Sequence, residues 1–198
     1  MMKYFAITLL IFLALSVNGQ KLKWLNKLSY NSTIEPGKAI MYGNFIQRLG
    51  FSSGGFAQEL QIINLDTEEL YSFTVKPALK SAKENTFIYF IKPGNYAILN
   101  YLWTQSKWYG GKIFTEPIYK GIASTADLDE KIKSGQISKD ELKQFTFSVT
   151  ENSLTYLGTW HFDKEIVKFK DKKLDLDTPL SKRFKKLNFS QAIIELPH

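Results

Sequence analysis

Aromatic and basic side chains gather in one short stretch near the middle of the chain, and their chemistry suits binding rather than catalysis. The candidate ligand-binding residues are Tyr101, Trp103, Lys107, Trp108 and Tyr109. Indole and phenol rings that flank a loop can stack on the faces of sugars, while a lysine among them can meet an anionic group. The alternative interpretation is that these rings pack the interior of a hairpin, because large flat side chains also dominate protein cores.

A second group of candidate residues is basic and lies near the C-terminus. It comprises Lys182, Arg183, Lys185 and Lys186. On a helix these side chains would lie opposite Leu180, Phe184 and Leu187, which gives the segment one charged and one apolar face. Such a helix either attaches peripherally to an anionic membrane surface or docks on the domain with its charged face in solvent. The sequence leaves both interpretations open.

The sequence lacks the short motifs of common catalytic sites. It has no Gly-x-Ser-x-Gly elbow, no phosphate-binding Gly-Lys-Ser/Thr loop and no His-Glu-x-x-His pattern. There is no cysteine, which excludes disulfides, thiolate metal sites and cysteine nucleophiles. His161 and His198 are the two histidines, so a histidine zinc site or a Ser-His-Asp relay has few possible members. We expect no catalytic residue, no bound metal and no cofactor.

Paired carboxylates are the remaining catalytic candidates. They occur at Glu68-Glu69, at Asp127, Asp129 and Glu130, and at Asp175 and Asp177. A glycosidase needs two such groups that face each other across a cleft. These pairs lie in an expected turn, an expected helix and near a helix start, where solvation and capping explain them. A non-enzymatic protein is therefore the leading hypothesis, and a polysaccharide-active hydrolase with an unrecognised acidic site is the alternative.

The N-terminal segment predicts export. Residues 1–19 begin with Met-Met-Lys, continue with an apolar run from Tyr4 to Leu15 and end in Ser-Val-Asn-Gly. This is the order of regions in a cleavable signal peptide, and the run of about 12 residues is shorter than the roughly 20 that cross a bilayer as a helix. We expect cleavage after Gly19 and a periplasmic, envelope-associated or secreted protein, with an uncleaved anchor as the alternative.

The net charge narrows the partners that an exported chain would favour. The sequence holds 26 basic and 19 acidic residues, a formal net charge of +7, or +6 without Lys3 of the signal peptide. This surplus favours anionic surfaces, such as acidic polysaccharide or phospholipid head groups, although charged faces in solvent also produce it. Export argues against nucleic acid. We expect a glycan or an envelope protein as partner, with peripheral contact to an anionic membrane as a further option.

Brief runs of β-branched and aromatic residues predict a mainly β fold. The expected strands cover residues 39–47, 59–65, 70–76, 86–92, 96–104, 112–115, 145–150, 154–162 and 165–170, with 173–176 as a further candidate. Turn residues separate many of them, and at this spacing successive strands form a meander or a sandwich. We expect an antiparallel β-sandwich of immunoglobulin or prealbumin type, in a single domain over residues 38–198 that follows a lead-in segment at 20–37.

Two breaks in the β pattern predict helices. Within residues 124–143, Ser138 stands three residues before Glu141, which is the spacing of a capping box. We expect a short helical insertion there. Near the C-terminus, the sequence Asp-Thr-Pro at 177–179 predicts a helix over 179–187 with proline at its first position.

Two segments of this pattern resemble a known class of module. Residues 90–98, Phe-Ile-Lys-Pro-Gly-Asn-Tyr-Ala-Ile, resemble the Pro-Gly-x-Tyr hairpin of transthyretin-like or PEGA-like β-sandwich modules in bacterial envelope proteins. Residues 147–158 are similar to the hairpin that follows in small exported proteins of that kind. Both segments predict a strand, a tight turn and a returning strand. The resemblance implies a sandwich with a binding, structural or accessory role, and it assigns no functional residue.

Overall fold

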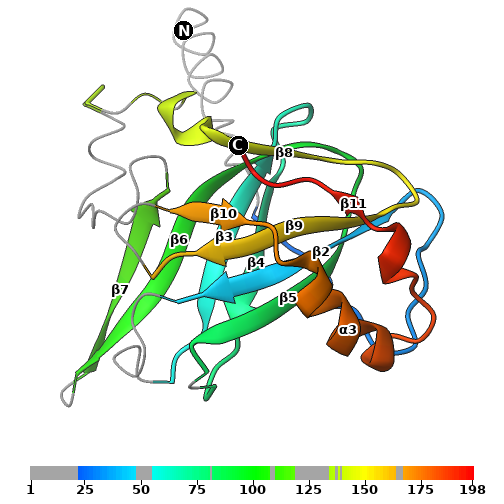
Figure 1. The fold of residues 1–198 in the computed structure, drawn as a ribbon. Helices are drawn as coiled ribbons and strands as arrows, with labels where there is room; N and C mark the ends of the chain where they lie inside the picture. Colours follow the sequence, from blue (N-terminus) through cyan, green and yellow to red (C-terminus); the bar gives the residue numbers. More distant parts are fainter. Residues whose placement is uncertain are drawn as a thin grey trace, which may run out of the picture.

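The computed structural model describes residues 22–47, 55–80, 82–107, 110–118, 134–136, 138, 140–163 and 167–198. These residues form two β-sheets that lie face to face, with an α-helix and two short 3-10 helices beside them (Figure 1). The expected signal peptide at 1–19 lies outside the described residues. Among the described helices, none combines the length and the hydropathy needed to span a membrane.

The first sheet contains six strands. They are Lys23–Trp24 (β1), Gln58–Asn64 (β3), Leu70–Lys76 (β4), Gly94–Lys107 (β6), Gly110–Pro117 (β7) and Phe145–Val149 (β8). Their order is β1-β4-β3-β6-β7, and β8 pairs with the N-terminal part of β6. All neighbours are antiparallel except β1 and β4. The long strand β6 thus connects β3, β7 and β8.

The second sheet contains five strands. They are Ala39–Ile46 (β2), Glu84–Ile91 (β5), Leu154–His161 (β9), Lys168–Lys170 (β10) and Ile193–Ile194 (β11). Their order is β10-β9-β2-β5, with β11 beside β9, and β9 runs parallel to both β2 and β11. The mainly β prediction is confirmed, but the sheets are mixed rather than antiparallel throughout. A tight turn enforces antiparallel pairing only between consecutive strands, and long connections leave the direction of β9 free.

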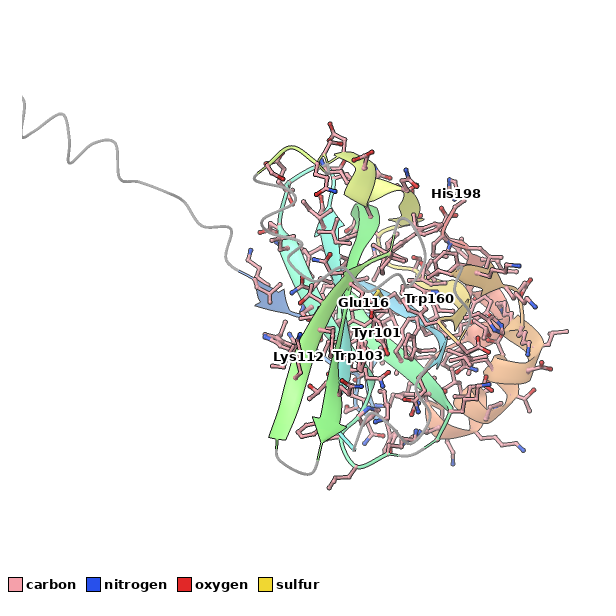
Figure 2. All side chains as sticks on the ribbon, turned by 90° about the vertical axis from the view of Figure 1, so that its left-hand side faces the viewer. Tyr101, Trp103, Lys112, Glu116, Trp160 and His198 are labelled. Carbon is pink, nitrogen blue, oxygen red and sulfur yellow. The ribbon has the colours of Figure 1, made fainter. Side chains whose placement is uncertain are left out.

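Large aromatic side chains fill the space between the two sheets. Trp160 on β9 has its ring centroid 5.0 Å from that of Phe87 on β5 and 6.2 Å from that of Phe73 on β4. Phe45 on β2 meets Tyr101 on β6 at 5.6 Å, so both sheets contribute to one core. Figure 2 labels one core residue from each sheet, Tyr101 and Trp160. Burial of a phenylalanine ring stabilises a fold by about 1.5–3 kcal/mol. This core therefore takes the place of disulfides in a chain without cysteine.

The two segments that resemble hairpins are connections between the sheets. β5 lies in the second sheet and β6 in the first, and β8 and β9 are separated in the same way. Gly94 has φ +145° at the first connection, and the Asp66 carboxylate accepts the backbone N–H of Asn95 at 3.0 Å. The strand β6 pairs with β8 rather than with β5, and the rings of Tyr96 and Phe147 stack across this pair with centroids 5.5 Å apart. The hairpin prediction is wrong because a local pattern marks a turn but not the sheet that receives the next strand.

The C-terminal helix begins earlier than predicted. The helix α3 spans Lys173–Arg183 rather than 179–187, and Pro179 lies inside it rather than at its first position. The carboxylate of Asp171 accepts the backbone N–H of Lys173 at 2.9 Å, which satisfies one of the free donors at the helix start. Apolar side chains on one side of α3 pack against the face of the second sheet that points away from the first. A further 3-10 turn, η3, follows at Phe189–Gln191.

The predicted helical insertion at 124–143 lies only partly within the described residues. The backbone N–H of Glu141 donates to Ser138 Oγ at 3.1 Å, and the backbone N–H of Ser138 donates to the Glu141 carboxylate at 2.8 Å. These reciprocal bonds are the predicted capping box. They start a single turn of 3-10 helix, Asp140–Lys143 (η2), rather than a longer α-helix. Residues 124–133 lie outside the described part of the chain.

The lead-in segment crosses from one sheet to the other. Its strand β1 pairs with β4 at the edge of the first sheet, and Lys27 then forms a β-bridge with Tyr89 of the second sheet. The backbone N–H of Phe90 donates to the carbonyl of Asn26 at 2.9 Å. This path places Tyr30 against the C-terminal end of α3, far from its position in the sequence.

Candidate functional site

The structure places part of the predicted aromatic surface in the core. Tyr101 is 1% exposed and Trp103 is 6% exposed, and both belong to the core that the two sheets share. The ring of Trp103 stacks on Phe114 with centroids 4.5 Å apart, and its indole N–H donates to Glu116 at 2.9 Å (Figure 2). These two rings therefore do not form an exposed stacking surface. The remaining members, Trp108, Tyr109 and the side chain of Lys107, lie outside the described residues.

The predicted basic cluster is exposed, and one of its members differs from the rest. The cluster is Lys182, Arg183, Lys185 and Lys186, at the end of α3 and just after it. Arg183 lines a cavity between α3 and the lead-in segment, whereas the three lysines do not line it. Arg183 is thus the member of the cluster that is placed to contact a ligand in this cavity.

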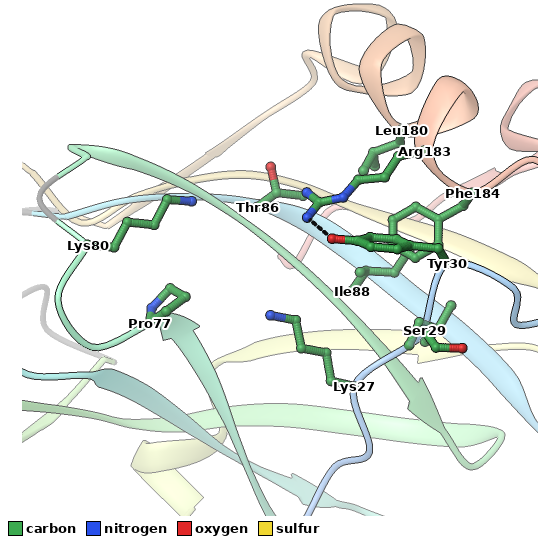
Figure 3. A pocket seen from close by; sticks show the side chains of 11 residues that line it. Lys27, Ser29, Tyr30, Pro77, Lys80, Thr86, Ile88, Leu180, Arg183 and Phe184 are labelled. Atoms are coloured by element: carbon green, nitrogen blue, oxygen red, sulfur yellow. Dashed lines mark hydrogen bonds between the residues drawn. The ribbon is translucent and has the colours of Figure 1, made fainter.

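The cavity beside α3, here named the α3 pocket, has a volume of about 420 Å³. Its walls come from four segments that are distant in the sequence (Figure 3). The lead-in contributes residues 27–30, the chain after β4 contributes Pro77 and Lys80, β5 contributes Thr86 and Ile88, and the end of α3 contributes Leu180, Arg183 and Phe184. The volume is in the range of cavities that hold small molecules.

The floor of the α3 pocket is apolar. Leu28, Ile88, Leu180 and Phe184 line it and belong to the buried cluster between α3 and the second sheet. Tyr30 stands beside this floor with 55% exposure, and its ring meets Phe184 edge to face with centroids 5.6 Å apart. A ligand could rest an apolar body on side chains that the fold already holds in place.

Positive charge surrounds the opening of the α3 pocket. Lys27, Lys80 and Arg183 are exposed lining residues, and their charged ends point toward the same open space (Figure 3). All eleven lining residues are described, and none of them is Asp or Glu. Within the described part of the chain, the ammonium groups of Lys27 and Lys80 form no hydrogen bond or ion pair. The potential at the opening is therefore positive and attracts anions.

Arg183 and Tyr30 orient each other at the edge of the pocket. The guanidinium donates to the Tyr30 hydroxyl oxygen and lies 4.7 Å from the centre of its ring. This hydrogen bond first, then the charge of Arg183 and that of Lys27, lowers the pKa of the Tyr30 hydroxyl below its ordinary value. The phenol hydrogen is not used in this bond, and the guanidinium has further N–H groups, so both residues can still donate to a ligand.

The other polar groups of the lining are already engaged. Thr86 Oγ1 donates to Asn44 Oδ1 at 2.8 Å, and Ser29 Oγ shares a hydrogen bond with Ser32 Oγ at 3.1 Å. The oxygens of these two hydroxyl groups can still accept, but the two ammonium groups, the guanidinium and the Tyr30 hydroxyl give the lining more side-chain donors than acceptors. This balance suits the oxygens of an anion, whereas the hydroxyl groups of a neutral sugar need acceptors as well.

The lining of the α3 pocket, whose residues are all described, offers two lysines, an arginine and a tyrosine, and it includes no carboxylate or histidine. Across the described part of the chain, His, Asp and Glu side chains form no group of three or more that could hold a metal ion. Charge-assisted hydrogen bonds contribute about 1.5–3 kcal/mol each, so the three cations are the strongest attachment points that the pocket offers.

Sequence reasoning identified Arg183 but missed the residues that surround it. Lys27 and Tyr30 lie in a segment that we expected to be a simple lead-in, and Lys80 lies between the strands expected at 70–76 and 86–92. Tyr30 and Arg183 are 153 residues apart, so no local spacing connects them. One signal was available, since residues 20–34 contain three lysines and no acidic residue.

Comparisons with known proteins add no family to these observations. No protein-family model matches the chain, and no curated protein matches it. Among solved structures, the chain is similar to a leucine-rich repeat protein from Bacteroides thetaiotaomicron, with 9% sequence identity and a TM-score of 0.35. The similarity covers 63% of this chain and 14% of that protein. A likeness this distant assigns no function.

Proposed function

We propose that this chain is a non-enzymatic, exported binding module of the cell envelope, built on a β-sandwich of immunoglobulin or prealbumin type. Two facing sheets with one shared core, and two connections that pass between them, support the sandwich. The basic start, apolar run and small-residue end of residues 1–19 support export.

The observation that carries the binding role is the charge of the α3 pocket. Lys27, Lys80 and Arg183 surround an opening whose lining, all of it described, includes no carboxylate. Like charges at one opening repel one another, and an anionic ligand relieves that repulsion. The apolar floor adds contact area that a charged surface in solvent would not need.

The contacts of the described carboxylates favour binding over the alternative of polysaccharide hydrolysis. A glycosidase needs two free carboxyl groups on either side of the scissile bond. Two of the paired carboxylates have other roles, because Glu69 is held by two lysines and a tyrosine, and Asp177 is held by Tyr42 and Lys173. Three others, Asp127, Asp129 and Glu130, lie outside the described residues.

Retention of envelope components by the purified exported protein tests this role. We expect the protein to retain at least one class of component on arrays of glycans and lipids, and Arg183→Gln to abolish that retention without lowering the melting temperature. Lys186→Gln is the matched control, because Lys186 is an exposed basic residue of the same cluster that does not line the pocket.

Two results would contradict the proposal. Release of reducing ends from a polysaccharide by the purified protein would make it an enzyme. Equal retention by the protein, Arg183→Gln and Lys186→Gln would show that the pocket does not bind the retained component.

A further inference from the structure

The α3 pocket carries more positive charge than a single carboxylate would balance. Lys27, Lys80 and Arg183 bring three cations to one opening, and no Asp or Glu belongs to the fully described lining. A carboxylate or a sulfate ester brings one negative charge, whereas a phosphate monoester carries about −1.5 to −2 near neutral pH. Charge complementarity therefore favours the monoester over a carboxylate or a sulfate ester.

The donors of the pocket also match the shape of a phosphate group. A phosphate monoester presents three terminal oxygens, each a strong acceptor. The two ammonium groups act as mobile point charges, and the guanidinium offers a planar fork that meets two oxygens at once. Tyr30 adds a hydroxyl that can donate beside Arg183.

The floor of the pocket indicates that the ligand has an apolar body as well. Inorganic phosphate would fill a small part of a cavity of about 420 Å³. The remaining space faces Ile88, Leu180 and Phe184, which are buried side chains of the cluster under α3. Contact with these side chains removes apolar surface of the ligand from water, which favours binding.

We propose that the α3 pocket binds an amphiphilic phosphate monoester, with its phosphate among Lys27, Lys80 and Arg183 and its apolar body on Ile88, Leu180 and Phe184. The inference rests on the binding role proposed above and names the ligand class. Such a ligand is either a free alkyl or aryl phosphate or a phosphatidic acid of a membrane, part of whose acyl region would be the apolar body. Both sources share a phosphate monoester that is joined to an apolar body.

Calorimetric titration of the exported protein with a small ligand series tests the two halves of the ligand separately. The series is phenyl phosphate, methyl phosphate, inorganic phosphate, benzoate and benzyl alcohol. We expect phenyl phosphate to bind at least ten times more tightly than each of the others. Comparison with methyl phosphate isolates the apolar body, and comparison with benzoate and benzyl alcohol isolates the charge.

Variants of the rim locate the binding site. Arg183→Gln and Lys80→Gln should each weaken phenyl phosphate binding about ten- to a hundredfold, since each removes a charge-assisted hydrogen bond. Lys186→Gln should leave the affinity within about twofold, because Lys186 does not line the pocket and salt screens its exposed charge. These changes replace exposed side chains, so the melting temperature of each variant serves as the check that the fold is intact.

Flotation with lipid vesicles separates the two sources of the phosphate. Vesicles of phosphatidylcholine with phosphatidic acid present a monoester, and vesicles with phosphatidylglycerol present a diester of lower charge. If the natural source is a lipid, the protein floats with the first kind only, and Arg183→Gln does not. If the source is a free phosphate, phenyl phosphate binds and neither kind of vesicle is retained.

The outcomes also separate this inference from the broader binding role. Tight binding of a neutral or carboxylated ligand that is lost in Arg183→Gln would overturn the phosphate assignment and keep the binding role. Equal affinity for inorganic and phenyl phosphate would overturn the apolar half of the assignment. Absence of pocket-dependent binding to any ligand on the arrays or in the series would overturn both proposals.

Discussion

Two places in this molecule combine aromatic rings with charged groups, and they do so in opposite ways. Around Trp103, the ring is buried and stacked on Phe114, and its N–H donates to the acidic side chain of Glu116. Around Tyr30, the ring is more than half exposed and its partner is the cationic side chain of Arg183. The first arrangement uses its polar groups inside the fold, whereas the second leaves charge facing solvent.

The difference teaches how to separate core aromatics from binding aromatics. A ring on a strand face that another sheet covers is shut off from water, so its polar atom must find a partner within the protein. Trp103 lies on β6, in the core that the two sheets share, and meets that requirement with Glu116. Tyr30 lies in a connecting segment beside the end of a helix, where a cavity can remain open. Whether an aromatic ring is available to bind a ligand therefore depends more on its position in the topology than on the number of aromatic residues nearby.

Truncation of the two rings should give the largest contrast. Trp103→Ala should lower the free energy of unfolding by about 3–5 kcal/mol, because it opens a cavity in the core and removes the indole N–H from Glu116. Tyr30→Ala should lower it by less than about 1 kcal/mol, because exposed side chains contribute little. Urea denaturation of both variants measures the two values. Similar losses for the two variants would remove the distinction between core ring and pocket ring.

The anchoring of α3 is the next largest effect. Asp177 accepts hydrogen bonds from Tyr42 on β2, at 2.7 Å, and from Lys173. Asp177→Asn removes the charge that faces Lys173, whose ammonium is mostly buried, and should cost about 1–3 kcal/mol of stability. Asp175→Asn, an exposed change on the same helix, should cost less than about 0.5 kcal/mol. Chemical denaturation measures both variants.

Asp177→Asn also tests whether ligand binding in the α3 pocket depends on the anchoring of α3. Because α3 carries Arg183 and ends next to Phe184, loosening the helix should weaken ligand binding together with stability. Arg183→Gln should weaken binding at unchanged stability. If Asp177→Asn loses stability but keeps full affinity, the pocket does not depend on the anchored helix.

The sequence predicted the strands well because alternation and turn residues act locally. The prediction of residues 39–47 corresponds to β2 at Ala39–Ile46, and the strand expected at 70–76 is β4. Pairing was predicted less well, since the pattern around Pro93-Gly94 marks a turn equally in a hairpin and in a connection between sheets. The parallel pairing of β2 with β9 brings together strands that are distant in the sequence, so no local pattern predicts it.

The candidate site was harder to predict than the strands. Tyr101 and Trp103 are two residues apart, so alternation places them on one face of β6, but the sheet opposite decides whether that face is buried. The basic cluster was visible in the sequence, yet only Arg183 among its members lines the pocket. The other cations of the rim, Lys27 and Lys80, reach it through the crossing of the lead-in and the loop after β4.

The smallest expected effect is the ionisation of Tyr30. The hydrogen bond from Arg183 and the nearby positive charges lower the pKa of Tyr30, whereas burial raises the pKa of the core residue Tyr96 to about 12. Phenolate absorbance should show a step below pH 10.0 that disappears in Tyr30→Phe and moves upward in Arg183→Gln. The Tyr96 step should remain in both variants.

The same ionisation should be coupled to ligand binding, with a sign that follows from charge. An ionised Tyr30 is negative and repels a bound phosphate, so the affinity for phenyl phosphate should be highest below the pKa of Tyr30 and fall as pH rises through it. By reciprocity, saturating phenyl phosphate should raise the pKa of Tyr30. Tyr30→Phe removes the phenolate, so the decline in affinity should begin at higher pH. A decline that is identical in Tyr30→Phe would assign it to the lysines of the rim, and Tyr30 would then serve only to orient Arg183.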